Sequence, residues 1–228
     1  MSESAIPFDQ VRAWFFDLDG TLMDTDDQSV AALSRLLRFL GAGRAQRLAR
    51  RLVMFSETPT NAALTFLDIL HLDRVAFALE KRLKHADRSY SFKIIEGVAP
   101  MLAQLGSHHP LAVVSTRGAA AAEAFLAQYD LTTLFPVSVT RESTRRLKPH
   151  PAPVLYAAQA LGLKPEECVM VGDTTVDIRS ARRAGAWAVG VLCGFGEEKE
   201  LWRAGAHLVL PSTADLLSIR TLFAAESP

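Results

Sequence analysis

The chain is poor in cysteine and contains no hydrophobic run long enough to cross a membrane. Only two cysteines, Cys168 and Cys193, occur among its 228 residues. Small domains held together by disulfides carry far more cysteine, so we expect two buried, reduced thiols. The opening segment, MSESAIPFDQ, lacks the basic region and apolar run of a secretory signal. The longest apolar stretch, AWAVGVLCGF, is far shorter than the ~20 residues of a membrane-spanning helix. We therefore expect a cytoplasmic protein.

The sequence also lacks an excess of charge of either sign. Its 25 Lys and Arg residues balance its 25 Asp and Glu residues. This balance gives no basic footprint for nucleic acid or for an anionic membrane surface, so neither is expected as a partner. Apolar residues make up 49% of the chain, which is enough to bury a substantial core. The length suits one α/β domain, with or without a smaller companion.

Apolar runs and helical patterns alternate from about residue 97 onward. The expected strands are residues 110–115, 135–140, 168–172, 186–192 and 207–210, and the expected helices are residues 97–105, 119–129, 152–161 and 175–184. Short continuous apolar strands separated by helices predict a parallel sheet that is covered on both faces. The run at residues 11–16 has the same character and belongs to this sheet. The predicted fold class is α/β, with a doubly wound, Rossmann-like core.

Residues 24–93 interrupt this alternation. Apolar residues recur there at helical spacing, as in Val30, Leu33, Leu36, Leu37 and Leu40, and no run resembles a buried strand. The segment is much longer than an ordinary connection between elements. We therefore predict a core domain formed by residues 1–23 and 94–228, with an all-helical cap domain at 24–93.

Paired carboxylates follow the first apolar strand, in the stretch WFFDLDGTLMDTD at residues 14–26. Asp17 and Asp19 are two residues apart, so an extended chain projects them to the same side. In open parallel sheets, ligands bind beyond the carboxyl ends of the strands. Two close carboxylates repel each other unless one is protonated or a cation lies between them. Mg²⁺, which prefers oxygen ligands, suits this pair.

Polar residues also stand where the other expected strands end. Ser115 and Thr116 follow PLAVV, and their hydroxyl and amide groups suit phosphate oxygens. Asp173 follows CVMVG, and Asp177 lies one helical turn further on. Lys148 precedes the helix expected at residues 152–161. Carboxylates, hydroxyls and an ammonium group at one sheet edge predict a metal-assisted phosphoryl-transfer site.

With these motifs the chain resembles the haloacid dehalogenase-like hydrolases, in particular the phosphoglycolate phosphatase-like branch with a helical cap after the first strand. The motifs are DLDGT at residues 17–21, Ser115-Thr116, Lys148-Pro149 and GDTTVD at residues 172–177. The motifs occur in this order, and the resemblance spans nearly the whole chain. The resemblance implies a Mg²⁺-dependent phosphatase that acts on a small phosphorylated metabolite.

The resemblance also implies a role for each motif residue. The catalytic residues would be Asp17, Asp19 and Lys148. Asp17 would attack phosphorus to form an aspartyl-phosphate, and Asp19 would protonate the leaving alcohol and later activate water. An aspartate at position 19 favours phosphate ester chemistry over dehalogenation. The implied metal ligands are Asp17, the main-chain carbonyl of Asp19, and Asp173, with Asp177 ordering the metal's water shell. The resemblance implies that Ser115 and Lys148 bind the transferring phosphoryl group, assisted by Thr116. From its position just beyond the hydroxyl pair, Arg117 is a further candidate substrate-binding residue.

Several alternatives stay open at the level of sequence. Ser115 and Thr116 could begin a helix, Asp177 could form a surface salt bridge, Lys148 could be an ordinary loop lysine, and Arg117 could be a solvated residue at a helix start. Arg117 could also reach a second anionic group on the substrate. A sugar-phosphate mutase and a catalytically idle binding protein on the same core are the alternative functions. The identity of the substrate and the choice between monomer and homodimer are left open.

Overall fold

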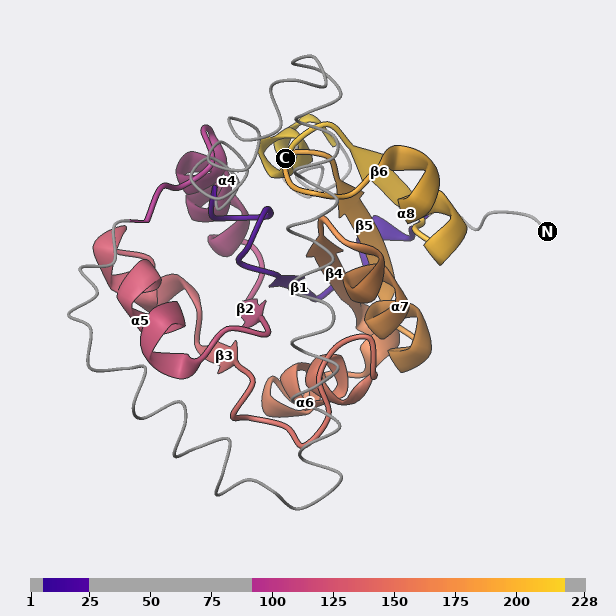
Figure 1. Ribbon diagram of the computed structural model, residues 1–228, viewed down its shortest axis with the longest axis horizontal. Coiled ribbons are helices and arrows are strands. Elements are labelled where there is room, and N and C mark those ends of the chain that lie inside the picture. The colour runs from indigo at the N-terminus through magenta and orange to yellow at the C-terminus, as the bar shows by residue number, and fades with distance from the viewer. Residues whose placement is uncertain (1–5, 25–91, 220–228) are drawn as a thin grey trace, which may run out of the picture. The chain divides into compact units, whose positions relative to one another are not determined.

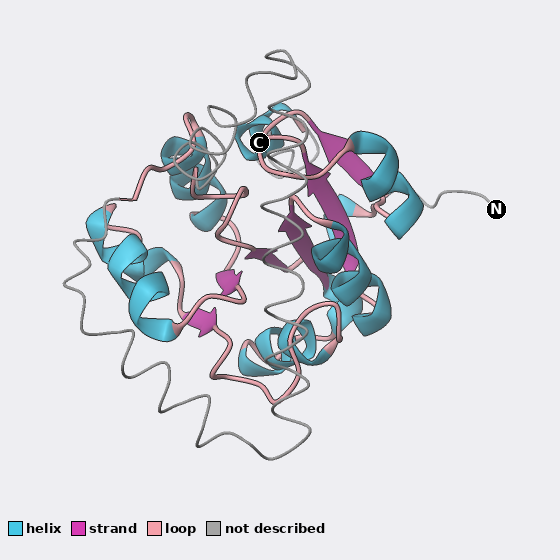
Figure 2. Cartoon of the chain, viewed as in Figure 1, coloured by secondary structure: helices cyan, strands magenta, loops and turns pink. Residues whose placement is uncertain are grey.

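The computed structural model describes residues 6–24 and 92–219. The strands are β1 (Ala13–Phe16), β2 (Leu111–Val114), β3 (Val137–Val139), β4 (Cys168–Gly172), β5 (Trp187–Val191) and β6 (Leu208–Leu210). The helices are α4 (Val98–Gly106), α5 (Ala119–Gln128), α6 (Ala152–Ala160), α7 (Thr175–Ala184) and α8 (Glu198–Ala204). Single-turn and two-turn 3₁₀ helices lie at Phe8–Gln10, Thr132–Leu134, Pro165–Glu167 and Thr213–Ser218. Figure 2 shows the strands in the middle of the described core, with helices on both sides of them.

The six strands found within residues 6–24 and 92–219 form one parallel sheet in the order β3-β2-β1-β4-β5-β6. The chain runs outward in one direction from β1 to β3 and then restarts beside β1 with β4. This order places a topological switch point between β1 and β4, where open α/β sheets bind their ligands. The prediction of a doubly wound parallel core is confirmed.

The two faces of the sheet are buried under different helices, because side chains alternate along each strand. Trp14 and Phe16 of β1 pack in one core with residues of α4 and α5, such as Leu102 and Phe125. Phe15 packs in the other core with residues of α6, α7 and α8. Figure 1 shows α4 and α5 on one side of the sheet and α6, α7 and α8 on the other. Both faces of β1 are thereby fixed, which holds its carboxyl end in place.

Some elements differ from the sequence prediction. Helix α8 was not predicted, because its seven residues bury only Leu201 and give no clear periodicity. Most strands are shorter than predicted by one to three residues. Both cysteines are free thiols, as predicted, but only Cys168 is buried and Cys193 is partly exposed. Among the described residues, no helix has the length and apolar character needed to span a bilayer.

The predicted helical cap, residues 24–93, lies outside the described residues except for Asp24, Phe92 and Lys93, and it stays a prediction. The chain on either side of it is paired. The Asp24 amide donates to the Lys93 carbonyl at 2.7 Å, and the Ile95 amide donates to the Leu22 carbonyl at 3.0 Å. Met23 and Ile94 form an antiparallel bridge. We refer to residues 22–24 and 93–95 as the junction.

Candidate active site

The first carboxylates are positioned by a tight turn at the end of β1. The Asp17 amide still donates to the Val171 carbonyl of β4 at 3.0 Å, so Asp17 is fixed by the sheet. The chain then turns back, with the Met23 amide donating to the Leu18 carbonyl at 2.8 Å. Gly20 has a φ of +69°, a conformation that favours glycine. A Cβ atom at Gly20 would also overlap the Asp173 carboxylate. The Asp-Gly-Thr sequence thus closes this turn against the neighbouring strand.

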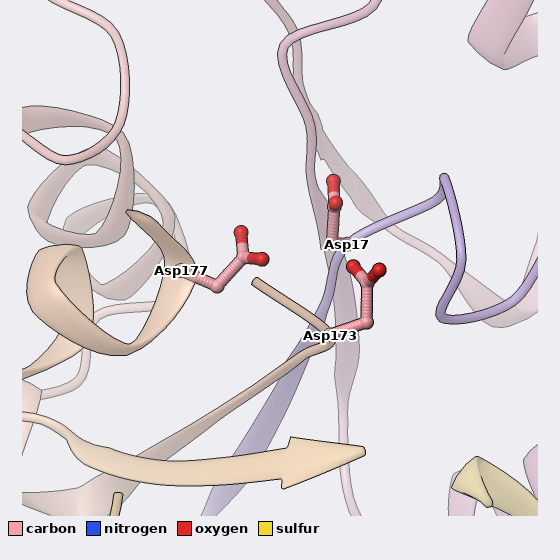
Figure 3. A group of neighbouring side chains, drawn as sticks. All are labelled: Asp17, Asp173 and Asp177. Carbon is pink, nitrogen blue, oxygen red and sulfur yellow. The ribbon is translucent and has the colours of Figure 1, made fainter. Parts of the chain in front are cut away.

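Three buried aspartates converge at the switch point. Asp17 comes from the end of β1, Asp173 from the end of β4 and Asp177 from the first turn of α7 (Figure 3). One carboxylate oxygen from each residue lies within 4.8 Å of the others. The structure therefore brings together residues that are up to 160 positions apart, at the sheet edge where the sequence predicted them.

Lys148 lies among these carboxylates. Its ammonium group is 2.9 Å from Asp17 Oδ1 and 2.6 Å from Asp177 Oδ1, and it donates to the Val114 carbonyl at 2.8 Å. Only 2% of the lysine side chain is exposed. The alternative of an ordinary loop lysine is therefore wrong, because a buried ammonium group requires such partners.

Both oxygens of the Asp177 carboxylate are engaged. Oδ1 receives the Lys148 ammonium, and Oδ2 accepts from the Thr174 amide at 3.1 Å and from the Thr174 hydroxyl at 2.5 Å. Asp177 thus caps the start of α7 and orients Lys148. The residue is fully buried, so the alternative of a surface salt bridge is wrong.

Asp173 is held by groups that the sequence analysis did not identify. Its Oδ2 accepts from the Phe195 amide at 2.7 Å, and its Oδ1 accepts from the Thr21 hydroxyl at 3.4 Å. A Cβ atom at Gly194 would overlap the same carboxylate. The Phe195 donor is a backbone amide, so the residue type at position 195 gives no sign of it. Gly20 and Gly194, which lie against the Asp173 carboxylate, could have indicated a close approach of the chain.

The cluster carries more negative than positive charge when every group is ionised. Burial raises the pKa of Asp17 to about 7, with further contributions from Asp177 and Asp19, although Lys148 opposes the rise. Burial also raises the pKa of Asp173 well above its ordinary value, and Asp177 and Asp17 add to this effect. Burial alone would lower the pKa of Lys148, but Asp17 and Asp177 raise it. The lysine is therefore the permanent cation of the site.

The residues present fit a divalent cation. Three carboxylates against one ammonium leave a deficit of positive charge, which a hard cation with oxygen ligands would remove. Although Lys148 lies within ion-pair distance of Asp17 Oδ1, this buried oxygen accepts no hydrogen bond. All three aspartates have the carboxylate oxygens that Mg²⁺ prefers, and both oxygens of Asp173 and both oxygens of Asp177 also accept hydrogen bonds. The charge and the oxygen content of the cluster thus suit a divalent cation.

Asp19 is not part of this cluster in the structure. Both of its carboxylate oxygens accept from Arg117, Oδ2 from Nε and Oδ1 from Nη2, each at 2.6 Å. Arg117 is therefore not a solvated residue at a helix start. A paired arginine for Asp19 was not predicted, since the two residues are 98 positions apart.

Ser115 and Thr116 lie in the turn between β2 and α5. Ser115 is buried, and its hydroxyl accepts from the Arg117 amide at 3.2 Å. Thr116 is partly exposed. Helix α5 begins at Ala119, with Gly118 preceding it, so neither hydroxyl residue occupies the helix N-cap. The alternative of a simple helix start is wrong.

Comparison with known proteins agrees with this geometry. A family model described as haloacid dehalogenase-like hydrolase matches residues 14–191. The chain is 28% identical over 218 residues to a phosphoglycolate phosphatase from Photorhabdus laumondii, covering 91% of this chain and 92% of that protein. A hydrolase structure from Pseudomonas syringae is 28% identical, with a TM-score of 0.65 and coverage of 92% and 97%. A putative β-phosphoglucomutase structure from Thermotoga maritima is 25% identical, with a TM-score of 0.65 and coverage of 92% and 98%. The chain, with its aspartate motifs at the ends of β1 and β4, belongs to the haloacid dehalogenase-like hydrolases.

Proposed function

We propose that the protein is a Mg²⁺-dependent phosphatase that hydrolyses a small phosphorylated metabolite through an aspartyl-phosphate. One observation supports this proposal above the others. Asp17, at the end of the central strand, lies 2.9 Å from a buried ammonium group and within 4.8 Å of two further buried carboxylates. Phosphoryl transfer requires a positioned nucleophile together with neutralisation of charge, and this cluster has groups suited to both.

The proposed reaction has two displacements at phosphorus. In the first, an Asp17 carboxylate oxygen bonds to phosphorus while the bond to the ester oxygen breaks, and Asp19 supplies the proton that the leaving alkoxide takes up. In the second, Asp19 takes a proton from water, the water oxygen bonds to phosphorus, and the bond to Asp17 breaks. The products are an alcohol and orthophosphate, and both aspartates return to their starting states.

The other residues would bind the transferring phosphoryl group and the metal, and would offset the negative charge at the site. Lys148 would contact the transferring phosphoryl group from its place beside Asp17, and Ser115 and Thr116 would donate hydrogen bonds to its oxygens. Asp17, the Asp19 main-chain carbonyl and Asp173 would hold Mg²⁺, with Asp177 fixing its surroundings. The metal would offset negative charge on the phosphoryl oxygens.

The nature of the relatives guides the choice of substrate. The match to a phosphoglycolate phosphatase extends over nearly the full length of both proteins, so we propose a small phosphorylated acid as the first compound to test. The similarity to a putative β-phosphoglucomutase supports a sugar-phosphate mutase as the second candidate. A mutase would release little net phosphate and would require a bisphosphate activator.

The decisive experiment measures phosphate release from a panel of small phosphate monoesters, with Mg²⁺ or with EDTA. The monoesters are phosphoglycolate, sugar phosphates and nucleoside monophosphates, and pyrophosphate, an anhydride, is tested with them. We expect Mg²⁺-dependent release concentrated on one or two compounds, and none with Asp17→Asn. If folded protein releases no phosphate but converts a sugar phosphate in the presence of bisphosphate, the mutase is correct. Near-normal turnover by Asp17→Asn would refute the aspartyl-phosphate route.

A further inference from the structure

The pair formed by Asp19 and Arg117 is too well ordered for an incidental surface contact. The guanidinium donates two parallel hydrogen bonds of 2.6 Å to the two oxygens of one carboxylate. Such bidentate pairs combine geometric specificity with strength. The side chains are only 29% and 20% exposed, so water screens this pair less than an exposed one.

The guanidinium of Arg117 also contacts an aromatic ring. Its Cζ lies 6.0 Å from the centre of the Phe92 ring, within the range of a cation–π contact. Phe92 is itself anchored, because its carbonyl accepts from the Tyr129 hydroxyl and the Gln128 amide group, each at 2.7 Å. The guanidinium is thus placed between an aromatic ring and Asp19.

The backbone of Arg117 is fixed as well. Its amide donates to the Ser115 hydroxyl at 3.2 Å, and its carbonyl accepts from the Arg141 amide at 3.1 Å. The guanidinium can therefore change partner by a side-chain movement while the backbone of Arg117 stays in place. The neighbouring turn, which holds the proposed phosphate-binding hydroxyls, would stay in place.

The pairing conflicts with the role proposed for Asp19. A group that protonates a leaving alcohol must direct an oxygen to that alcohol, yet both Asp19 oxygens accept from Arg117. A substrate carboxylate has the same shape and charge as the Asp19 carboxylate, so it can accept the same two donors. Because Asp19 stands beside the proposed ester oxygen, such a carboxylate must be within a few bonds of that oxygen.

We propose that Arg117 is a specificity-determining residue that exchanges Asp19 for a carboxylate on the leaving group of the substrate. The inference rests on the proposed function and deepens it, because it names the substrate class as short phosphorylated hydroxy acids. Binding of the acid releases Asp19, which then receives a proton from solvent and presents it to the ester oxygen. A neutral leaving group leaves the pair intact and reacts poorly.

The test compares two esters of equal size. 2-Phosphoglycolate carries the carboxylate, and 2-hydroxyethyl phosphate carries a neutral hydroxymethyl group in its place. The measured quantity is the ratio of kcat/KM for the two compounds with Mg²⁺. We expect the wild-type ratio to favour the acid, and Arg117→Met to lower it by about 10- to 100-fold, the range for a lost charge-assisted bidentate contact. Arg117→Lys should recover part of the preference, since lysine keeps the charge without the paired donors.

Arg141→Met is the matched control. Arg141 is 33% exposed, close to the exposure of Arg117, and its side chain pairs with Glu142 rather than with Asp19. We expect this variant to keep the wild-type ratio within about threefold. A misfolded fraction lowers both rates equally, so the ratio separates recognition from structural damage. An unchanged ratio in Arg117→Met would overturn the inference.

The role of Arg117 can also be tested by substrate binding, without relying on hydrolysis. If the wild-type protein hydrolyses neither these two esters nor any other compound of the panel, the proposed function fails, and calorimetric binding of the two esters replaces turnover. If it hydrolyses other compounds of the panel but not 2-phosphoglycolate, the inferred substrate class is overturned while the proposed function stands. Preference for the acid that is lost in Arg117→Met and kept in Arg141→Met would support the exchange. Equal binding of both esters to the wild-type protein would refute it.

Discussion

Replacement of Lys148 by methionine tests whether the buried ammonium group holds the acidic cluster together. Methionine has a similar length but no charge, so Asp17 and Asp177 lose the cation that lies 2.9 and 2.6 Å from them. Removal of one partner from a buried ion pair costs about 3–5 kcal/mol. We expect a loss of this size in the free energy of unfolding at pH 8 in EDTA, or a fall in melting temperature of about 10 °C.

The loss should depend on pH and on metal. At pH 5.5 it should shrink, because Asp17, whose pKa burial raises to about 7, can then take up a proton in place of the ammonium contact. Millimolar Mg²⁺ at pH 8 should restore part of the stability by supplying positive charge. Urea unfolding followed by circular dichroism measures all three conditions.

Lys199→Met provides the control, since Lys199 is exposed on α8. Its stability should stay within about 0.5 kcal/mol of the wild-type value. If Lys148→Met loses less than about 1 kcal/mol at pH 8 in EDTA, the ammonium does not neutralise the cluster and the electrostatic account of the site is refuted.

Three further predictions follow from the same cluster. First, Asp17→Asn should be more stable than wild type in EDTA. A raised folded pKa means that wild type loses stability as pH rises from about 4 to about 7, so the difference should be near zero at pH 4 and reach a few kcal/mol at pH 8 by urea unfolding. Second, Mg²⁺ should raise the wild-type melting temperature more at pH 8 than at pH 5.5, because it requires ionised carboxylates; an equal rise at both values would contradict carboxylate ligation. Third, Gly194→Ala should cost about 1–3 kcal/mol and weaken Mg²⁺ binding measured by calorimetry, because its Cβ would displace the Asp173 carboxylate; unchanged binding would contradict that placement.

The sheet and the acidic cluster could be predicted because each depends on local sequence. Apolar runs such as CVMVG at β4 identify buried parallel strands, and in a parallel sheet their carboxyl ends meet at one edge. Asp17, Asp173 and Lys148 therefore assemble from the topology alone. Asp177 follows from helical spacing, since it lies in the first turn of α7.

The remaining features depend on contacts that the sequence pattern does not encode. The path of the turn after β2 decides which residue pairs with Asp19. From the sequence alone, several arginines that follow β2 were equally good candidates for this pairing. The Phe195 amide that holds Asp173 is a backbone group, which any residue there would supply. Helix α8 is too short to show a period, and the single buried side chain at Leu201 gives no repeat.

The junction has a consequence for the engineering of this protein. Residues 22–24 and 93–95 leave and re-enter the core as a hydrogen-bonded pair, so the two ends of the intervening segment start from neighbouring points. The entropy of closing such a segment grows only with the logarithm of its length, by about 0.6 kcal/mol for each doubling. Segments of very different size can therefore be transplanted between these two anchor points while the strands that carry the aspartates keep their order. The junction is therefore a place where the segment between residues 24 and 93 can be exchanged without rebuilding the sheet that carries the aspartates.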